Sequence, residues 1–112
     1  MNIISYDHFE SVHICAGTVI KAEEFPKAKK PAYKIWVDFG PQYGIKQTSA
    51  QITKLYTLES VIGKKVLGVL NFEPKNIAGF QSEFLLLGFK SNQGDICLAT
   101  TGSDVPNGEK LH

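Results

Sequence analysis

The feature that most constrains the fold is the alternation of residue types in AYKIWVDF, residues 32–39. The inner set is Tyr33, Ile35, Val37 and Phe39, and the outer set is Lys34, Trp36 and Asp38. A period of two is typical of a β-strand that has one buried and one exposed face. The chain must therefore build a sheet, and Lys34 and Trp36 are expected side by side on its exposed face.

Other segments also have β-strand character. They are residues 12–24, 45–50, 64–72 and 82–89, with a last β segment at 95–100. Gly17, inside the long first segment, indicates a bulge or a tight bend. PQYG, residues 41–44, is a turn signal between the second and third strands.

Between the third and fourth strands the period changes. In TLESVIG, Thr57 can cap a short helix and Gly63 can end it. Three strands, a short helix, two strands and short terminal extensions follow the order of the OB-fold, a five-stranded Greek-key β-barrel. We therefore predict an all-β protein in which residues 1–112 form one domain.

The charge balance restricts the possible partners. Twelve basic and eleven acidic residues give a net charge of +1, which is too small for a general nucleic-acid coat protein. All twelve basic residues are lysines. Because lysine offers a point charge and not a planar fork, we expect contacts to RNA phosphates that weaken strongly with salt.

The first candidate site is the lysine-rich stretch FPKAKKPAYK, residues 25–34. Lys29, Lys30 and Lys34 lie close in sequence to Trp36, and an exposed ring beside cations is suited to stacking an RNA base. The alternative is a solvated loop, with Trp36 covered by another part of the chain.

The second candidate site is the loop in NFEPKNIAGFQSEF, residues 71–84. It offers Asn71, Lys75 and Ser82, and Gly79 permits close approach of the backbone to a ligand. The alternative is a long polar connection without a ligand. Lys46 of the third strand completes the predicted RNA-binding set.

Two apolar strands suggest a partner. Residues 66–72 and 84–89 are apolar at almost every position, whereas a solvated antiparallel strand is polar at every second residue. A second copy could cover them in a homodimer, the helix or the chain ends could cover them within one subunit, and we favour the dimer.

Signals for other functions are weak. The three histidines have no zinc-site spacing with Cys15, Cys97 or the carboxylates, and no phosphate loop, dinucleotide fingerprint or nucleophile elbow occurs. We expect no enzyme activity, metal or cofactor, and two free thiols. The N-terminus lacks a signal peptide and no run could cross a membrane, so a cytoplasmic protein is expected.

Five stretches in order carry a family resemblance over nearly the whole chain. They are FESVHICAGTVIKAEEFP, KKPAYKIWVDFG, GIKQTSAQITKLY, IGKKVLGVLNFEPKNIAGFQSEFLLLGF and VPNGEKL. With them the chain resembles the CsaA family, small bacterial and archaeal proteins described as export-related chaperones and built on a tRNA-binding domain. The stretch from Asn71 to Leu87 also resembles the N-x-x-P-x-x-x-x-G-x-x-S pattern of tRNA-binding domains appended to some aminoacyl-tRNA synthetases.

The resemblance implies a homodimeric OB-fold that binds tRNA, and recognition of unfolded secretory precursors and the export machinery. It matches Asn71, Lys75 and Ser82 to the synthetase-type motif. Many relatives have arginine where this chain has Cys15 and Lys29, and EFLL after Ser82 favours the stand-alone proteins over the synthetase appendages. The runner-up function is a chaperone in which Phe25, Phe80 and Phe84 line an apolar groove between the subunits for unfolded peptides, with RNA binding secondary.

Overall fold

Strands dominate the computed structural model, which describes residues 1–112. In chain order the elements are α1 (Tyr6–Ser11), β1 (Ile14–Glu24), β2 (Tyr33–Asp38), α2 (Gly40–Tyr43), β3 (Ile45–Ala50), β4 (Lys65–Val69), β5 (Lys75–Ile77), β6 (Phe80–Ser82), β7 (Leu85–Leu86), β8 (Gly88–Lys90) and β9 (Ile96–Leu98). No helix is long and apolar enough to cross a bilayer.

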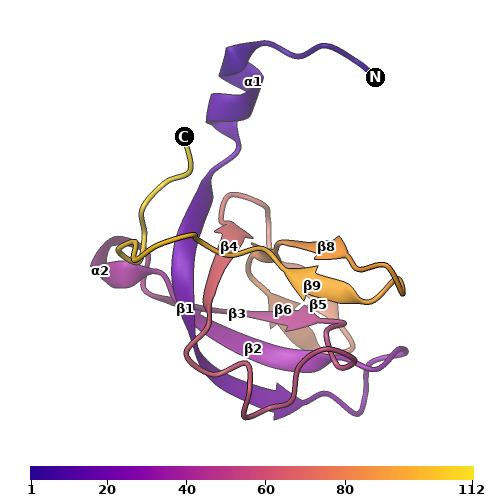
Figure 1. Cartoon of the computed structure of the whole chain (residues 1–112). Coiled ribbons are helices and arrows are strands. Elements are labelled where there is room, and N and C mark those ends of the chain that lie inside the picture. Colours follow the sequence, from indigo (N-terminus) through magenta and orange to yellow (C-terminus); the bar gives the residue numbers. More distant parts are fainter.

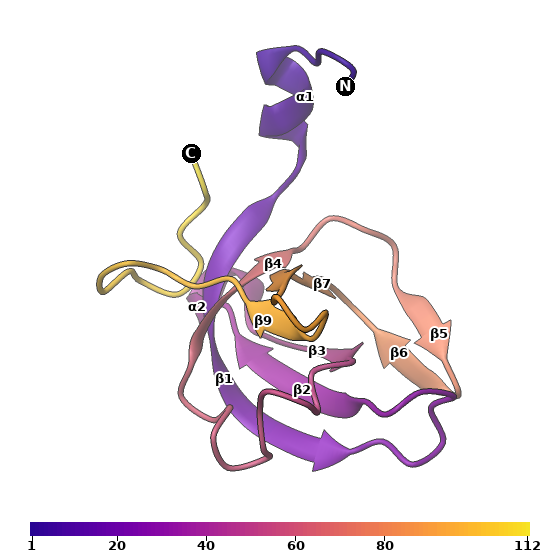
Figure 2. The same cartoon turned by 45° about the vertical axis from the view of Figure 1, so that its right-hand side comes forward.

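Five strands curl into a nearly closed barrel (Figures 1 and 2). Their order is β3-β2-β1-β4-β7, and every pairing is antiparallel. The Thr48 hydroxyl of β3 donates to the Phe84 carbonyl at 2.8 Å, and the Glu83 amide donates to the Gln47 carbonyl at 2.8 Å. These bonds join the two ends of the sheet, so the predicted OB-type barrel is confirmed.

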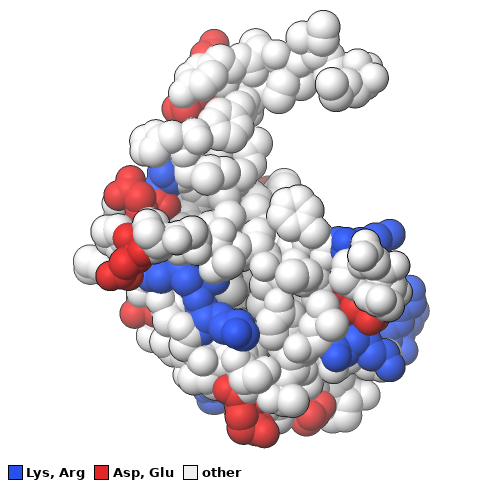
Figure 3. All heavy atoms as spheres, in the orientation of Figure 1, with Lys and Arg blue, Asp and Glu red and all other residues white.

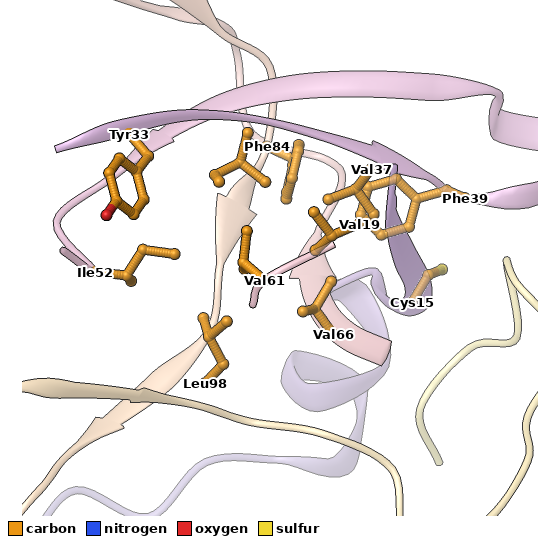
Figure 4. Close-up of a cluster of buried hydrophobic side chains, with 11 residues drawn as sticks. Cys15, Val19, Tyr33, Val37, Phe39, Ile52, Val61, Val66, Phe84 and Leu98 are labelled. Carbon is orange, nitrogen blue, oxygen red and sulfur yellow. The ribbon is translucent and has the colours of Figure 1, made fainter. Parts of the chain in front are cut away.

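The core fills the barrel with buried side chains from β1, β2, β4 and β9 and from the segments between strands (Figure 4). The inward residues of β2 that alternation predicted are all buried. Phe39 packs edge-on against Phe84, with ring centroids 4.9 Å apart. Gly68 of β4 leaves the space for this pair, because a Cβ there would lie 2.8 Å from the Phe84 ring and 2.9 Å from Phe39.

The two chain ends meet beside β1. The backbone of residues 108–111 bonds to β1, for example through the Leu111 amide and the Ile14 carbonyl at 2.8 Å. The Lys110 ammonium donates to the Glu10 carbonyl at 2.9 Å. Residues 1–11, which we call the N-terminal arm, project away from the barrel (Figure 1), and Ile3 in this arm is 97% exposed.

Three sequence predictions about elements were wrong. Residues 58–63 form consecutive turns and not a helix. The Thr57 and Ser60 side chains bond to each other's amides at 2.9 Å, as at the start of a helix, but the Ile62 and Lys64 amides then bond to carbonyls only three residues back. The predicted strand 82–89 is divided among β6, β7 and β8, which pair with three different strands. The irregularity in β1 falls between Val19 and Lys21 and not at Gly17.

Candidate nucleic-acid interface

One row of polar side chains crosses four strands on the outer face of the sheet. Lys34 of β2 pairs in register with Ser49 of β3, and Lys75 of β5 pairs with Ser82 of β6. The Ser49 and Ser82 hydroxyls lie 3.2 Å apart and connect the two pairs. Because cross-strand partners share a face, the row brings Lys34 and Lys75 to the same side of the molecule.

A cluster of aromatic rings lies beside this row. Phe80 contacts Trp36 edge-on at 5.9 Å and Phe25 at 5.6 Å between ring centroids. The Lys34 ammonium lies 5.1 Å from the centroids of both Phe25 and Phe80. The Trp36 indole N–H donates to the Gln47 Oε1 at 3.2 Å, which fixes the half-buried ring on the sheet.

Lys21, which sequence patterns did not predict as a site residue, has its ammonium 4.6 Å from the Trp36 ring centroid. Strict alternation would put Ile20 opposite Trp36, but the irregularity in β1 makes Lys21 the partner of Trp36 instead. A bulge commonly redirects a side chain in this way. The sequence signal for Lys21 was the long first strand, which carries charged residues towards its end. We call Lys21, Lys34, Trp36, Lys75 and Phe80 the lysine–aromatic face.

A cleft of about 880 Å³ opens beside this face. Its walls come from the β1–β2 loop, the end of β3, the β5–β6 hairpin and the strands β7 to β9. Lys27, Lys29 and Lys30 line it, and all three are exposed. Much of the rest is aliphatic, including Ile52, Leu86 and Leu98. The predicted lysine cluster is thus divided, with the loop lysines at the cleft and Lys34 on the lysine–aromatic face.

Two predicted site residues, Asn71 and Lys46, do not belong to either group of lysines. The Asn71 carboxamide accepts from the His13 amide at 2.9 Å and donates to the Ser11 carbonyl at 2.7 Å, so it connects the end of β4 to the start of β1. Lys46 pairs with the inward-facing Val37 and therefore lies on the opposite face of β3 from Gln47, the partner of Trp36. A contact of either residue with RNA stays a prediction.

The rings predicted for peptide binding have different environments. Phe84 is 4% exposed and belongs to the core, and Phe25 is also 4% exposed beneath Lys34. Only Phe80 of the three is partly exposed. Inward packing against Phe39 is the reason that Phe84 does not line a surface groove in this subunit.

Two tyrosines are linked by hydrogen bonds to Leu98, which lines the cleft. The Tyr33 hydroxyl donates to the Tyr56 carbonyl at 2.9 Å, and the Tyr56 hydroxyl accepts from the Leu98 amide at 2.8 Å. Burial raises the pKa of both tyrosines above the ordinary value, so they stay neutral donors. No group of three His, Cys, Asp or Glu side chains comes together in a way that could hold a metal ion.

Charged side chains are unevenly distributed over the surface. In the space-filling view, lysines gather at the edge of the molecule beside β8 and in a second group over the β1–β4 side (Figure 3). Acidic side chains border both groups in this view. A net charge of +1 therefore conceals local basic areas.

The chain is similar to known proteins over nearly its whole length. The family model described as "Putative tRNA binding domain" matches residues 14–110. Methionine--tRNA ligase of Methanocaldococcus jannaschii is 32% identical over 111 residues, which are 99% of this chain but 17% of that protein. The chain therefore spans a small part of the length of this relative.

Solved structures match over the full length. A crystal structure of the chaperone CsaA from Bacillus anthracis str. Ames shares 42% identity and a TM-score of 0.92, covering 99% of this chain and 100% of that one. The CsaA chaperone protein from Picrophilus torridus has 40% identity and a TM-score of 0.91, covering 98% and 100%. The chain belongs to the tRNA-binding domain family and, within it, to the CsaA proteins.

Proposed function

We propose that this chain binds tRNA without catalysing a reaction, and that its lysines hold the RNA phosphates. One observation carries the proposal: two sets of lysines lie close to the β5–β6 hairpin. Lys34 and Lys75 belong to the row on the outer face, and Lys27, Lys29 and Lys30 line the cleft. Closely spaced ammonium groups attract a polyanion and release its counterions on binding. A tRNA ligand also implies a location in the cytoplasm.

The aromatic rings add a second kind of contact. The face of the partly exposed Trp36 or Phe80 ring can stack an unpaired base, and base–aromatic stacking contributes about 1–3 kcal/mol per base. Lys21 lies over the Trp36 ring in the free protein, so its flexible side chain has to move aside for a base. Lysines and rings together favour looped RNA over a plain duplex.

Self-association belongs to the same proposal. The N-terminal arm has large apolar side chains in the open, with Met1, Ile3, Ile4 and Tyr6 all exposed, and Phe89 of β8 is 73% exposed. A homodimer in which each copy covers these residues of the other would remove them from water. Two copies would also present two sets of lysines to one RNA, which raises avidity without a new contact.

A second candidate function is a chaperone for unfolded precursor proteins and the export machinery. The relatives described as CsaA chaperones and the aliphatic lining of the cleft favour it. Apolar capture of a peptide should persist or strengthen as kosmotropic salt rises, whereas phosphate binding should weaken.

Co-purification from a cell lysate at low salt separates the two functions. The bound fraction is tested for nucleic acid and for polypeptide, and the column is then washed with increasing salt. We expect small RNA of tRNA size that elutes as salt rises. Polypeptide that stays bound through the salt wash, with no RNA at any salt concentration, would contradict tRNA binding and favour the chaperone.

A further inference from the structure

The cleft beside the lysine–aromatic face has the charge of an anion-binding site. Lys27, Lys29 and Lys30 line it, and none of its lining residues is an aspartate or glutamate. A cleft of one sign of charge with low-dielectric walls concentrates ligands of the opposite sign. Its natural ligands are therefore anionic, and RNA is the anion that the proposed function supplies.

The floor of the cleft is mainly apolar. Ile52, Leu86 and Leu98 supply aliphatic surface, and the small residues Ala32 and Ala50 leave room for a flat group to approach. A volume of about 880 Å³ lies within the usual range of ligand sites, which is roughly 300–1,000 Å³. A phosphate alone would use the lysines and leave this apolar floor in contact with water.

Polar groups are available to orient a base there. The Gln51 carboxamide is exposed and has no hydrogen bond within the chain. Asn76 uses its Oδ1 to accept from the Gly79 amide at 2.9 Å, which leaves its Nδ2 group free to donate. A mostly apolar pocket with a few converging polar groups is the common design of a small-molecule or base site.

We propose that this cleft receives an unpaired nucleotide of the RNA, with the base on the aliphatic floor and the neighbouring phosphates on Lys27, Lys29 and Lys30. The inference rests on the proposed tRNA-binding function and specifies the feature recognised, which is a nucleotide that has left the helical stack. A duplex keeps its bases stacked and paired, so it can offer only phosphates to the same lysines.

The test compares two RNAs on the full chain. One is a labelled single strand of about 12 nucleotides, within the range of site sizes for an OB-fold, and the other is the same strand annealed to its complement. We expect the single strand to bind more tightly, and removal of bases from its central positions to weaken binding by about three- to tenfold without changing its salt dependence.

Variants then assign the effect to the cleft. Ala28→Leu narrows the cleft from a loop position, and Gln51→Ala removes the free carboxamide. Both should lower affinity for the single strand and leave duplex binding unchanged. Gln93→Ala, in the exposed turn between β8 and β9 and outside the cleft, is the matched control and should have no effect. Thermal melting of each variant verifies that it is folded.

Each other outcome has a distinct meaning. Equal binding of both RNAs, with no effect of base removal or of the cleft variants, would overturn the inference while tRNA binding stands. No binding of either RNA or of tRNA at low salt would overturn both. Loss of unfolded-peptide binding in Ala28→Leu, with RNA binding intact, would assign the cleft to peptides and overturn the inference.

Discussion

At the scale of single residues, Lys34 indicates how a chain without arginine can position a cation. Its ammonium lies 5.1 Å from the centroids of both Phe25 and Phe80, and cation–π contacts contribute about 0.5–1 kcal/mol at exposed sites. A lysine held in this way has already lost part of its side-chain freedom before RNA arrives. Binding a phosphate then costs less conformational entropy than it would for a free lysine.

Asn71 provides a prediction at the same scale. Asn71→Ala removes the bonds to the His13 amide and the Ser11 carbonyl, so we expect the free energy of unfolding to fall by about 1 kcal/mol. Urea unfolding measures it, with Asn92→Ala in the exposed β8–β9 turn as the control. A large loss of tRNA affinity with unchanged stability would show instead that Asn71 contacts RNA.

The sequence predicted some of these side-chain positions and missed others for a physical reason. Alternation along one strand was enough to place Lys34 and Trp36 on one face. The position of Lys46 depends on how β3 pairs with β2. The role of Asn71 depends on contacts with His13 and Ser11, which precede it by 58 and 60 positions in the sequence. Such non-local contacts leave no period in the sequence.

At the scale of elements, β4 fits against two rings because it has no side chain at Gly68. A Cβ at this position would lie 2.8 Å from Phe84 and 2.9 Å from Phe39, and both rings belong to the core cluster. Real packed cores do not tolerate such approaches without shifting side chains or backbone. The strand and the Phe39–Phe84 pair therefore constrain each other.

Gly68→Ala should consequently destabilise the fold. We expect a loss of about 1–3 kcal/mol in the free energy of unfolding, measured by chemical denaturation. Gly102→Ala is the matched control, because nothing lies within 4 Å of its added Cβ and its backbone is not in the left-handed region. Equal stability of the two variants would mean that β4 does not pack against the rings as described.

Strands and helices were predictable where the alternation of residue types along the chain determines the structure. The faces of β2 and the order of the large strands followed from the sequence. The turns at residues 58–63 did not, because the Ile62 and Lys64 amides bond to carbonyls only three residues back and Val61 is packed in the core. The pairing of residues 108–111 with β1 joins the two ends of the chain and has no local signal.

At the scale of the whole molecule, the N-terminal arm is the feature that a lone subunit leaves unexplained. Its base is held by Asn71 and Lys110, which direct it away from the barrel. We expect light scattering to give about twice the chain mass of 12.4 kDa. Ile3→Ser with Ile4→Ser should shift the protein toward the monomer, because both side chains are exposed in one subunit.

Ile62→Ser is the control for that experiment, since Ile62 is also exposed but lies in the turns between β3 and β4. It should leave the mass unchanged. A wild-type protein that stays monomeric at high concentration would contradict the dimer. A dimer that survives the double arm variant would place the interface elsewhere.

The most direct test of the account is the affinity for tRNA measured over a range of salt concentrations, for the wild type and for Lys29→Ala with Lys30→Ala. We predict that the double variant binds more weakly and that the slope of log K against log salt becomes shallower by roughly 1.5, because two phosphate contacts are lost. Its thermal stability should not change, since both side chains are exposed. The same affinity and the same slope in both proteins would contradict the claim that these lysines hold the RNA.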